Sequence, residues 1–538
     1  MIINSSSDSN FASQDNEEDS SFIFSESDVS ILDEDEEMEE PLHGKYQWTE
    51  IGGGLDNELN KSFLIENNVQ VDEDCLVSLD YFLQIFSKEL IEKIIYFSNK
   101  KGDKIIDNEK QKKQKRKLWK HIQFNEFKAV LGVFIAMGIT NKHCTREYWN
   151  RSKLTLTPGI SEVFSRERFM QICKCLTFED IGNKKRIFEN KYELLRTQII
   201  NNSQRVYIPK KELSLDESLV SFKGRVKNKV FMPLKRHRFG LKAYLITEAE
   251  SSYVWNWSLF TGAKHTIPEI VIPLCLPLEG ENYCIFMDRF YTSPYLFSLL
   301  KFYGFSAVGT VQRNRLNITK DQEDSLSKLD SHKSQFYQST PDDLFLIAWK
   351  DKKLVTLLST YEDLKVITTE RYIKVEENYE NIQIDIPQII KTYSRFMGGV
   401  DRFDQSCSFF SYIPRTKRWY FRLFSHFLEI SLHNSYIIYQ KDTGINMKYI
   451  NYRKIIMKSL VKEFRFQKHI KETTKKFSLL NFSSNKNADC ELALGSKKFD
   501  CSIHKSKNEG RKQTKYYCNK CTLYVCVIPC YDEHRKLK

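Results

Sequence analysis

Long apolar runs and secretory signals are both missing from this chain of 538 residues. No uninterrupted apolar stretch approaches the roughly 18 residues that a membrane-spanning helix needs. The N-terminus, MIINSSSDSN, lacks the basic start and the apolar stretch of a secretory signal. No internal repeat is visible, and 41% of the residues are hydrophobic, so most of the chain should fold. These absences predict a soluble intracellular protein without a membrane partner.

Lysine and arginine are absent from residues 1–43, which contain 14 Asp or Glu residues. Because the whole chain has a formal net charge of +12, the other 495 residues carry +26. A charge of that size favours a polyanionic partner, since each neutralised phosphate releases condensed counterions. An ordinary lysine-rich surface gives the same total, and charge alone leaves both interpretations open.

Two segments of the chain have strongly biased composition. Low hydrophobicity and a single charge sign predict that residues 1–43 are disordered. A solubilising tail is the simplest role, and a nucleic-acid mimic or a phosphorylation target are the alternatives. The basic run KQKKQKRK (110–117) fits a phosphate contact, a nuclear import signal or a plain exposed loop.

Hydrophobic periodicity divides the rest of the chain into helical and strand-rich parts. Apolar residues recur at helical spacing over 79–100 and 124–139, and residues 419–440 are apolar nearly all round, as in a buried helix. After Pro209 short β-rich runs follow, with one intervening helix at 294–304. This order predicts a mixed α/β sheet. The expected strands are 213–215, 241–247, 253–260, 283–288, 305–311, 344–350 and 353–360.

Four aspartates stand where a sheet edge or a sharp turn can present them. Asp216 and Asp288 each follow directly after an apolar strand, and Asp401 and Asp404 follow a Gly-Gly break. Two Mg²⁺ ions about 4 Å apart serve phosphoryl transfer, and such hard cations prefer carboxylate oxygens. Taken singly, each aspartate is more often a turn former or a helix cap than a catalytic residue. Glu217, next to Asp216, should point to the opposite face of the strand and therefore serve a different environment.

The strings around these aspartates resemble piggyBac-type transposases. Five blocks follow the family's order, and further blocks on either side extend the resemblance over about residues 75–538. The blocks are LSLDESLVSFKGR, PLKRHRFGLKAY, FMDRFYTS, AVGTVQRNR and MGGVDRFDQ, preceded by FKAVLGVFIAMGI and REYWNRS and followed by RTKRWYFRLFSHFLEISLHNSYIIY. Chance agreement of so many blocks in one order is improbable.

The resemblance implies a metal-dependent DDE-type transposase that acts on double-stranded DNA. Asp216, Asp288 and Asp401 fall on the family's three catalytic aspartates, which hold Mg²⁺ or Mn²⁺, and Asp404 matches a further acid near the site. The family nicks the ends of its element, and the freed 3′-hydroxyl attacks the other strand to form a hairpin. It then joins the ends to TTAA targets and leaves no scar on excision.

The fold that the resemblance implies is α/β. An RNase H-like catalytic domain is interrupted by an insertion domain and flanked by a mainly helical dimerisation and DNA-binding domain and a C-terminal zinc module. The expected boundaries are an acidic tail at 1–43, helical parts at 75–210 and 407–470, catalytic parts at 211–311 and 391–406, an insertion at 312–390, a linker at 471–500 and a cysteine-rich zinc-binding domain at 501–538.

Basic residues lie next to each of the expected catalytic segments. Because an acidic metal site repels phosphate, arginine and lysine around it are what a DNA backbone requires. Some of them could instead be surface charges packed over aromatic rings. The candidate DNA contacts are Lys235, Arg236, Arg238, Lys242, Arg313, Arg315, Arg415, Lys417, Arg418 and Trp419.

Cysteines and histidines cluster at the C-terminal end. Pairs of ligands two residues apart, separated by a basic loop, fit tetrahedral zinc, whereas buried unligated cysteines are the simpler alternative. Seven candidates exceed the four ligands of one site and suggest two zinc ions, with Cys490 or His469 as a possible eighth ligand. The segment 501–538 has nine Lys or Arg residues against three acids, which suits DNA contact. The candidate ligands are Cys501, His504, Cys518, Cys521, Cys526, Cys530 and His534.

Three hypotheses for function follow from these residues and the resemblance. The first is a nuclear, dimeric cut-and-paste DNA transposase, which the four intact acids favour. The second is a domesticated descendant that binds DNA without strand transfer. The third is a general RNase H-like nuclease, which needs the same acids but not the zinc module.

Overall fold

A computed structural model describes most of the chain outside the acidic N-terminal segment. Contact clustering divides the chain into one unit at Met1–Leu460 and a second at Val461–Lys538. No helix among the described residues is long and apolar enough to cross a membrane. The described residues are 30–31, 46–53, 68–111, 119–180, 188–233, 238–361, 363–375, 378–412, 416–479, 492–507, 512–518, 523–526, 530 and 534.

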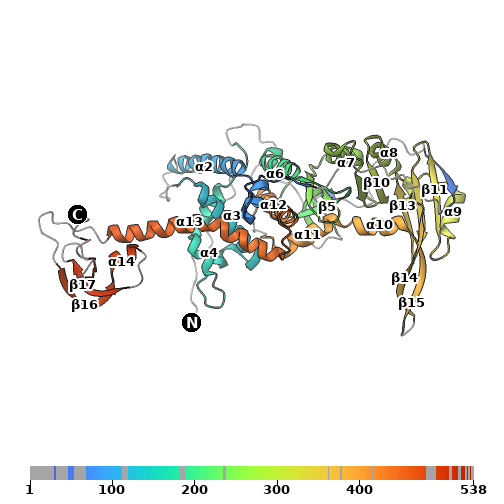
Figure 1. Ribbon diagram of the computed structural model, residues 1–538. Coiled ribbons are helices and arrows are strands. Elements are labelled where there is room, and N and C mark those ends of the chain that lie inside the picture. Colours follow the sequence, from blue (N-terminus) through green and yellow to red (C-terminus); the bar gives the residue numbers. More distant parts are fainter. Residues whose placement is uncertain are drawn as a thin grey trace, which may run out of the picture. The chain divides into compact units, whose positions relative to one another are not determined.

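Helices form the first part of the larger unit (Figure 1). The apolar pattern expected as one helix over 79–100 is two helices, because Phe86 has non-helical dihedral angles of φ −91° and ψ 76°. Ser87 then accepts a hydrogen bond from the backbone N–H of Leu90 at 3.2 Å and so begins the next helix. The helices are α1 (Ser78–Ile85), α2 (Lys88–Gln111), α3 (Phe124–Thr140), α4 (Pro158–Val163), α5 (Arg166–Cys175) and α6 (Glu193–Val206).

Helix α12 (Trp419–Thr443) returns to this helical part from late in the sequence and is buried on nearly every face, as its composition predicts. It packs on α1 and α6 and also on the sheet. The side chain of Asn434 accepts from the N–H of Val254 at 2.9 Å and donates to its C=O at 2.7 Å, which fixes the helix against a strand. Gly444, with φ +68°, ends α12, and α13 (Tyr449–Leu479) follows.

A mixed sheet of eleven strands crosses the larger unit. Its order is β1-β6-β7-β5-β9-β10-β13-β12-β11-β2, and β8 pairs with β7 beside this path. Strands β5, β9 and β10 are parallel, whereas β7 is antiparallel to β5. The first six are β1 (Ser30–Ile31), β5 (Glu212–Ser221), β6 (Lys229–Phe231), β7 (Phe239–Glu248), β8 (Val254–Leu259) and β9 (Cys284–Met287).

The far half of the sheet consists of β13, β12, β11 and β2. Except for β2, these strands lie in the sequence between β10 (Ser306–Thr310) and the late helices α10 (Gln388–Phe396) and α11 (Gly399–Phe410). Buried aromatic and branched side chains of these strands pack against α10. Figure 1 shows β14 and β15 leaving the sheet as a separate two-stranded ribbon. The strands are β2 (Gln47–Ile51), β11 (Ser334–Thr340), β12 (Phe345–Lys350), β13 (Leu354–Ser359), β14 (Val366–Val375) and β15 (Asn378–Pro387).

Several short elements complete the larger unit. Helices α7 (Ile267–Cys275) and α8 (Pro294–Phe302) connect strands, and α9 (Lys320–Ser327) precedes β11. The two-residue strands β3 (Asn68–Val69) and β4 (Tyr207–Ile208) pair with each other.

The second unit is small and has its own short sheet. Strands β16 (Leu492–Asp500) and β17 (Gln513–Cys518) are antiparallel, and α14 (Ser502–Lys507) lies between them in sequence. Its buried apolar cluster consists of Cys501, Val525 and Cys530, with three partly buried neighbours. Among the described residues of this unit, apolar burial is therefore small.

The structure differs from the sequence-based expectations in three places. Asp216 was expected after a strand at 213–215, but it lies inside β5, which continues to Ser221. Side chains on both faces of this strand are buried. The segment 471–500, expected to be a linker, contains the end of α13 and all of β16. In the acidic tail, Ser30–Ile31 form β1, parallel to β6, and the other residues of 1–43 lie outside the described residues. The same holds for 112–118 within the basic run.

Candidate active site and metal-ligand cluster

Sheet register brings the first two predicted aspartates side by side. In the parallel pair of β5 and β9, Leu215 lies opposite Met287, so the next residues, Asp216 and Asp288, are neighbours where β9 ends. Neighbouring residues in register on parallel strands point to the same face of the sheet. This pairing is the structural reason why acids 72 positions apart in the sequence can share one site.

The segment carrying the other two acids covers the same face of β5. Ser214 and Ser218 flank Asp216 at a spacing of two, so all three side chains point to one face. Ser214 Oγ donates a hydrogen bond to the C=O of Met397, and Ser218 Oγ donates to Asp404 Oδ1 at 2.5 Å. Asp216 is therefore enclosed between two links to the start of α11.

A glycine allows this close approach. A β-carbon added at Gly399 would lie 2.5 Å from Thr247 Oγ1 and 2.9 Å from Ser214 Cβ, closer than real contacts allow. The Gly-Gly break noted in the sequence is thus a packing requirement as well as the start of α11. Asp401 follows in the first turn of α11 and is exposed, and Asp404 is one turn further on. The four predicted acids therefore come from β5, from the end of its neighbour β9 and from α11, which packs on β5.

The carboxylates of β5 and β9 are in a poorly solvated environment. The side chain of Asp216 is 6% exposed, and its Oδ1 accepts from the N–H of Glu217 at 2.8 Å. Burial, followed by the charge of Glu217, raises the pKa of Asp288 to about 6, against the opposing effects of backbone N–H groups and Lys242. A carboxyl group whose charge is disfavoured in this way gains from a bound cation. Oxygen donors of this kind suit Mg²⁺ or Mn²⁺.

Glu217 belongs to the opposite face of β5, as alternation predicts. It is 7% exposed, and its Oε2 accepts a hydrogen bond from the hydroxyl of Tyr291 at 3.0 Å. Opposite it on β7 lies Tyr244. Glu217 thus contacts the residues after β9, whereas Asp216 faces α11.

The predicted DNA contacts have diverse environments. Arg238, Arg313 and Lys417 are exposed and remain predicted contacts. Arg315 is half-buried, and its Nη1 donates to the carbonyl oxygens of Arg289, Phe290 and Thr292. Lys235, Arg236 and Arg415 lie outside the described residues.

Three of the predicted contacts already have partners within the chain, and their contact with DNA stays a prediction. Trp419 is buried and stacks on Phe188 with ring centroids 4.0 Å apart. Lys242 is 4% exposed, and its Nζ lies 4.2 Å from the centre of the Phe290 ring. Arg418 donates to the carbonyl oxygens of Cys173 and Lys174 at the end of α5, at 2.8 and 3.2 Å. Their neighbours in the sequence are basic, but these side chains contact aromatic rings and helix carbonyl oxygens.

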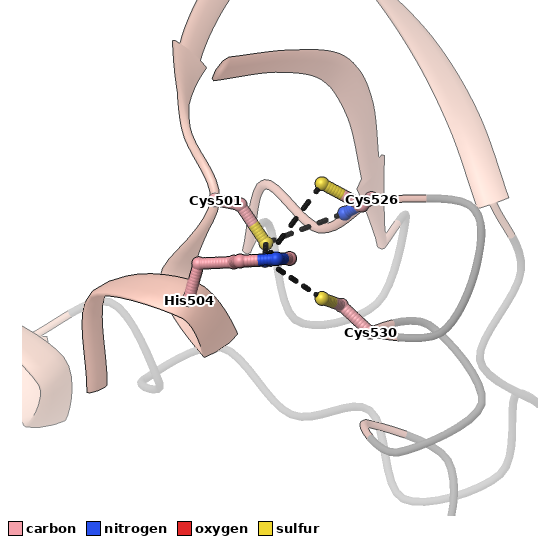
Figure 2. Close-up of side chains that lie close together, drawn as sticks. All are labelled: Cys501, His504, Cys526 and Cys530. Carbon is pink, nitrogen blue, oxygen red and sulfur yellow. Dashed lines mark hydrogen bonds between the residues drawn. The ribbon is translucent and has the colours of Figure 1, made fainter. Parts of the chain in front are cut away.

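Four of the seven predicted zinc ligands form one cluster. Figure 2 shows Cys501, His504, Cys526 and Cys530 converging, and their ligand atoms all lie within 4.8 Å of one another. His504 Nδ1 is 3.0 Å from Cys530 Sγ and 3.4 Å from Cys501 Sγ. Three sulfurs and one imidazole nitrogen around a common centre match the closed tetrahedral ligand set of structural zinc.

The surroundings of Cys501 favour its thiolate form. Burial alone raises its pKa, but hydrogen bonds from His504, Cys526 and Ile503 prevail and lower the pKa to about 6. A thiolate is the form that binds metal. Cys518 and His534 are buried but lie outside this cluster, and Cys490 and Cys521 lie outside the described residues.

Sequence reasoning missed two groups that hold the predicted acids. Ser214 and Ser218 link β5 to α11, and their period of two around Asp216 was a usable signal. Tyr291 was not singled out and Arg315 was expected on DNA, because nothing in a single sequence pairs Tyr291 with Glu217 or Arg315 with backbone carbonyls.

Comparisons with known proteins find relatives among transposases and transposase-derived proteins. A family model described as Transposase IS4 matches residues 78–436. Human PiggyBac transposable element-derived protein 3 is 24% identical over 349 residues, which cover 62% of this chain and 58% of that protein. Human PiggyBac transposable element-derived protein 2 is 25% identical over 331 residues, which cover 59% of this chain and 55% of that protein. The chain thus spans less than two thirds of either curated relative.

A solved structure has a similar fold. It is a chain of the cryo-EM structure of a piggyBac transposase synaptic complex with hairpin DNA, with a TM-score of 0.65 and 21% identity. The similarity covers 86% of this chain and 98% of that chain. At this identity the likeness concerns the fold, which is mixed α/β in both.

Proposed function

Because the chain belongs to the piggyBac-type transposases, we propose that it is a metal-dependent cut-and-paste DNA transposase. One observation carries the proposal: β5, which contains Asp216, pairs with β9 just before Asp288 and is linked to α11 by the hydrogen bond from Ser218 to Asp404. The proposed substrate is the double-stranded DNA at the ends of an element. The proposed reaction runs through a hairpin intermediate and joins the ends to TTAA targets, as in the family.

We assign β8-β7-β5-β9-β10 to the RNase H-like core of this enzyme. In this stretch of the sheet three antiparallel strands are followed by two that run parallel to β5. The strands β11 to β15, between β10 and α10, are then the insertion, and α11 brings Asp401 back to the core. This arrangement gives each acid a rigid support.

The residues present fit divalent metal. Asp216, Asp288 and Asp401 would hold Mg²⁺ or Mn²⁺, and Ser218 would orient Asp404 beside them. When bound, such ions supply an activated oxygen nucleophile and a Lewis acid for the leaving oxygen. The protein's own part is to keep the carboxylates in one place and to exclude water around Asp216 and Asp288. Exposed Arg238, Arg313 and Lys417 would neutralise the approaching DNA phosphates.

The second unit would act as a zinc-stabilised DNA-binding module. Cys501, His504, Cys526 and Cys530 offer a complete ligand set for one Zn²⁺. A second ion, using Cys518, Cys521 and His534, remains part of the proposal, as do homodimer formation and work in the nucleus. The excess of basic residues in 501–538 supports contact with DNA.

A second candidate function is DNA binding without strand transfer. Both human relatives carry the description "transposable element-derived", and a protein of this kind keeps the fold whether or not it still moves DNA. The intact acids favour the enzyme, because pure binding places no requirement on them. A general nuclease is less well supported, since it has no need of the Cys/His cluster.

A plasmid excision assay with the cognate DNA ends tests the proposal. We expect precise excision by the intact chain and none by Asp288→Ala, with unchanged binding of the ends when metal is absent. The control is Asp385→Ala, which changes an acid of β15 in the proposed insertion and should leave excision intact. Binding of the ends without any excision by the intact chain would support the second candidate and overturn the first.

A further inference from the structure

The loop that follows Asp288 is held by a side chain from a distant segment. Residues 288–293 connect β9 to α8. Nη1 of Arg315 donates to the carbonyl oxygens of Arg289, Phe290 and Thr292 at 3.1, 2.9 and 3.1 Å. Three carbonyl oxygens around one nitrogen form a compact, oxygen-lined seat for a positive charge.

The same loop has further anchors on its other side. The hydroxyl of Tyr291, whose side chain is fully buried, donates to Glu217 Oε2 at 3.0 Å. Thr292 closes the turn, because its hydroxyl and its N–H donate to the C=O of Asp288 at 2.8 and 3.2 Å. Gly309 on β10 makes room for it, since a β-carbon there would lie 2.1 Å from Thr292 Oγ1.

These anchors fix the direction of the Asp288 side chain. Oδ1 of Asp288 accepts a hydrogen bond from the N–H of Phe290 at 3.0 Å, and Arg315 donates to the carbonyl oxygen of the same residue. The orientation of the carboxylate therefore depends on the loop backbone that Arg315 holds. The carboxylate is also poorly solvated, and the backbone N–H groups of the loop, together with the charge of Lys242, oppose the effect of its burial on its pKa. A loop released by Arg315 would therefore release the carboxylate as well.

We propose that Arg315 is a positioning residue, which holds the loop 288–293 so that the carboxylate of Asp288 is fixed where it binds metal. The inference rests on the proposed function in one respect, namely that Asp288 is a metal ligand. It differs from the role expected from the sequence, in which Arg315 contacts DNA phosphate. Arg313, two residues earlier in the same short 3₁₀ turn, is exposed and 3.9 Å from Glu323, and so offers a matched control.

The test is Mn²⁺ binding to the full-length, zinc-loaded protein without DNA, followed by the electron paramagnetic resonance signal of free Mn²⁺. Asp288→Asn defines the binding that depends on Asp288. Arg315→Ala should weaken that binding by about tenfold, the usual effect of removing a residue that orients a metal ligand. Arg315→Lys should stay within about threefold of the wild type, because an ammonium group has three donors for the three carbonyls. Arg313→Ala should leave Mn²⁺ binding unchanged.

Equal Mn²⁺ affinity of Arg315→Ala and the wild type would overturn the positioning role. A second result would also overturn it. If Arg315→Ala without metal lowers the salt slope of DNA binding (the slope of the logarithm of the binding constant against the logarithm of the salt concentration) by about one, Arg315 contacts a phosphate. If Asp288→Asn itself binds Mn²⁺ like the wild type, the metal role of Asp288 fails, and the proposed function fails with it. Hydrogen exchange of the Phe290, Tyr291 and Thr292 amides gives a separate readout, which should accelerate in Arg315→Ala but not in Arg313→Ala.

Discussion

The carboxylate site and the Cys/His cluster are two candidate metal sites built on opposite principles. The carboxylates stand on strands and a helix of a large core, which is packed by buried apolar side chains. The Cys/His ligands belong to a small unit whose buried apolar cluster, as far as its residues are described, includes the two ligands Cys501 and Cys530. In the first case the fold makes the site, and in the second the metal would make the fold.

The donor chemistry follows the same division. Oxygen donors around Asp216 and Asp288 bind hard ions weakly and exchangeably, which suits catalysis. Three thiols and an imidazole bind zinc tightly and leave no open position, which suits structure. Removing each metal should therefore have different consequences for the two regions.

The largest expected effect is the loss of the second unit's fold when zinc is removed. Structural zinc contributes about 10–16 kcal/mol to the folding of small modules, far more than the small core of this unit can supply. A strong zinc chelator should abolish hydrogen-exchange protection of β16 and β17 and leave that of β5, β7 and β9 unchanged. Cys530→Ser should do the same without a chelator.

Magnesium removal is the matched control for this prediction. It should leave protection intact in both units, because the carboxylate site stands on packed strands. Retained protection of β16 and β17 after complete zinc removal would break the comparison, since the second unit would then fold by burial alone.

The sequence predicted the two regions unequally well, for physical reasons. Hydrophobic periodicity located the strands β7 to β10 and the helix α12, because burial of alternating or nearly all positions leaves a clear pattern. It placed Asp216 after a strand, whereas β5 continues to Ser221 because that strand is covered on both faces. Ligand spacing located the Cys/His cluster, since knuckle geometry is local in sequence.

Long-range contacts account for what the sequence could not supply. Lys242, Arg418 and Trp419 were expected on DNA, yet each is held by Phe290, helix carbonyls or Phe188. No local pattern reveals such partners, because a basic string looks the same whether it faces solvent or an aromatic ring. The hydrogen bonds from Arg315 to the loop after β9 could not be predicted for the same reason, because they too join segments that are distant in the sequence.

A second prediction concerns the stability of the metal-free carboxylate site. Because burial raises the pKa of Asp288 to about 6, the folded protein binds a proton between about pH 4 and 6 that the unfolded chain has released. The free energy of unfolding should therefore fall as pH rises through this window, by about 3 kcal/mol in all. Asp288→Asn should remove this fall and be the more stable protein at pH 7.5.

Denaturant titrations at pH 4.5 and 7.5 measure this effect. Added Mg²⁺ should stabilise the wild type at pH 7.5 but not Asp288→Asn. An identical pH dependence of Asp288→Asn and wild type would show that the site carries no uncompensated charge.

A third prediction tests whether packing alone builds the carboxylate site. Gly399→Ala places a methyl group 2.5 Å from Thr247 Oγ1 and should cost about 2 kcal/mol of stability, because α11 must move away from β5. Excision should fall further than stability, since Asp401 moves with the helix. Gly159→Ala in α4 is the matched control, because no atom lies within 4 Å of its added carbon. Thermal unfolding of both variants measures the difference, and an active, fully stable Gly399→Ala would contradict the close approach.

The smallest expected effect separates the two regions by charge. Exposed Arg313, beside the carboxylate site, should contribute one phosphate contact, so Arg313→Ala should lower the salt slope of DNA binding by about one. Arg371→Ala is the control, because this arginine is already neutralised by Asp351 at 2.6 Å and should not change the slope. Removal of zinc should reduce the salt slope of DNA binding by more than one. The nine basic residues of 501–538 would then no longer be held together by one fold. Equal slopes for all these proteins would mean that the charge of +26 is spread as a general field, and that neither region places it on particular phosphates.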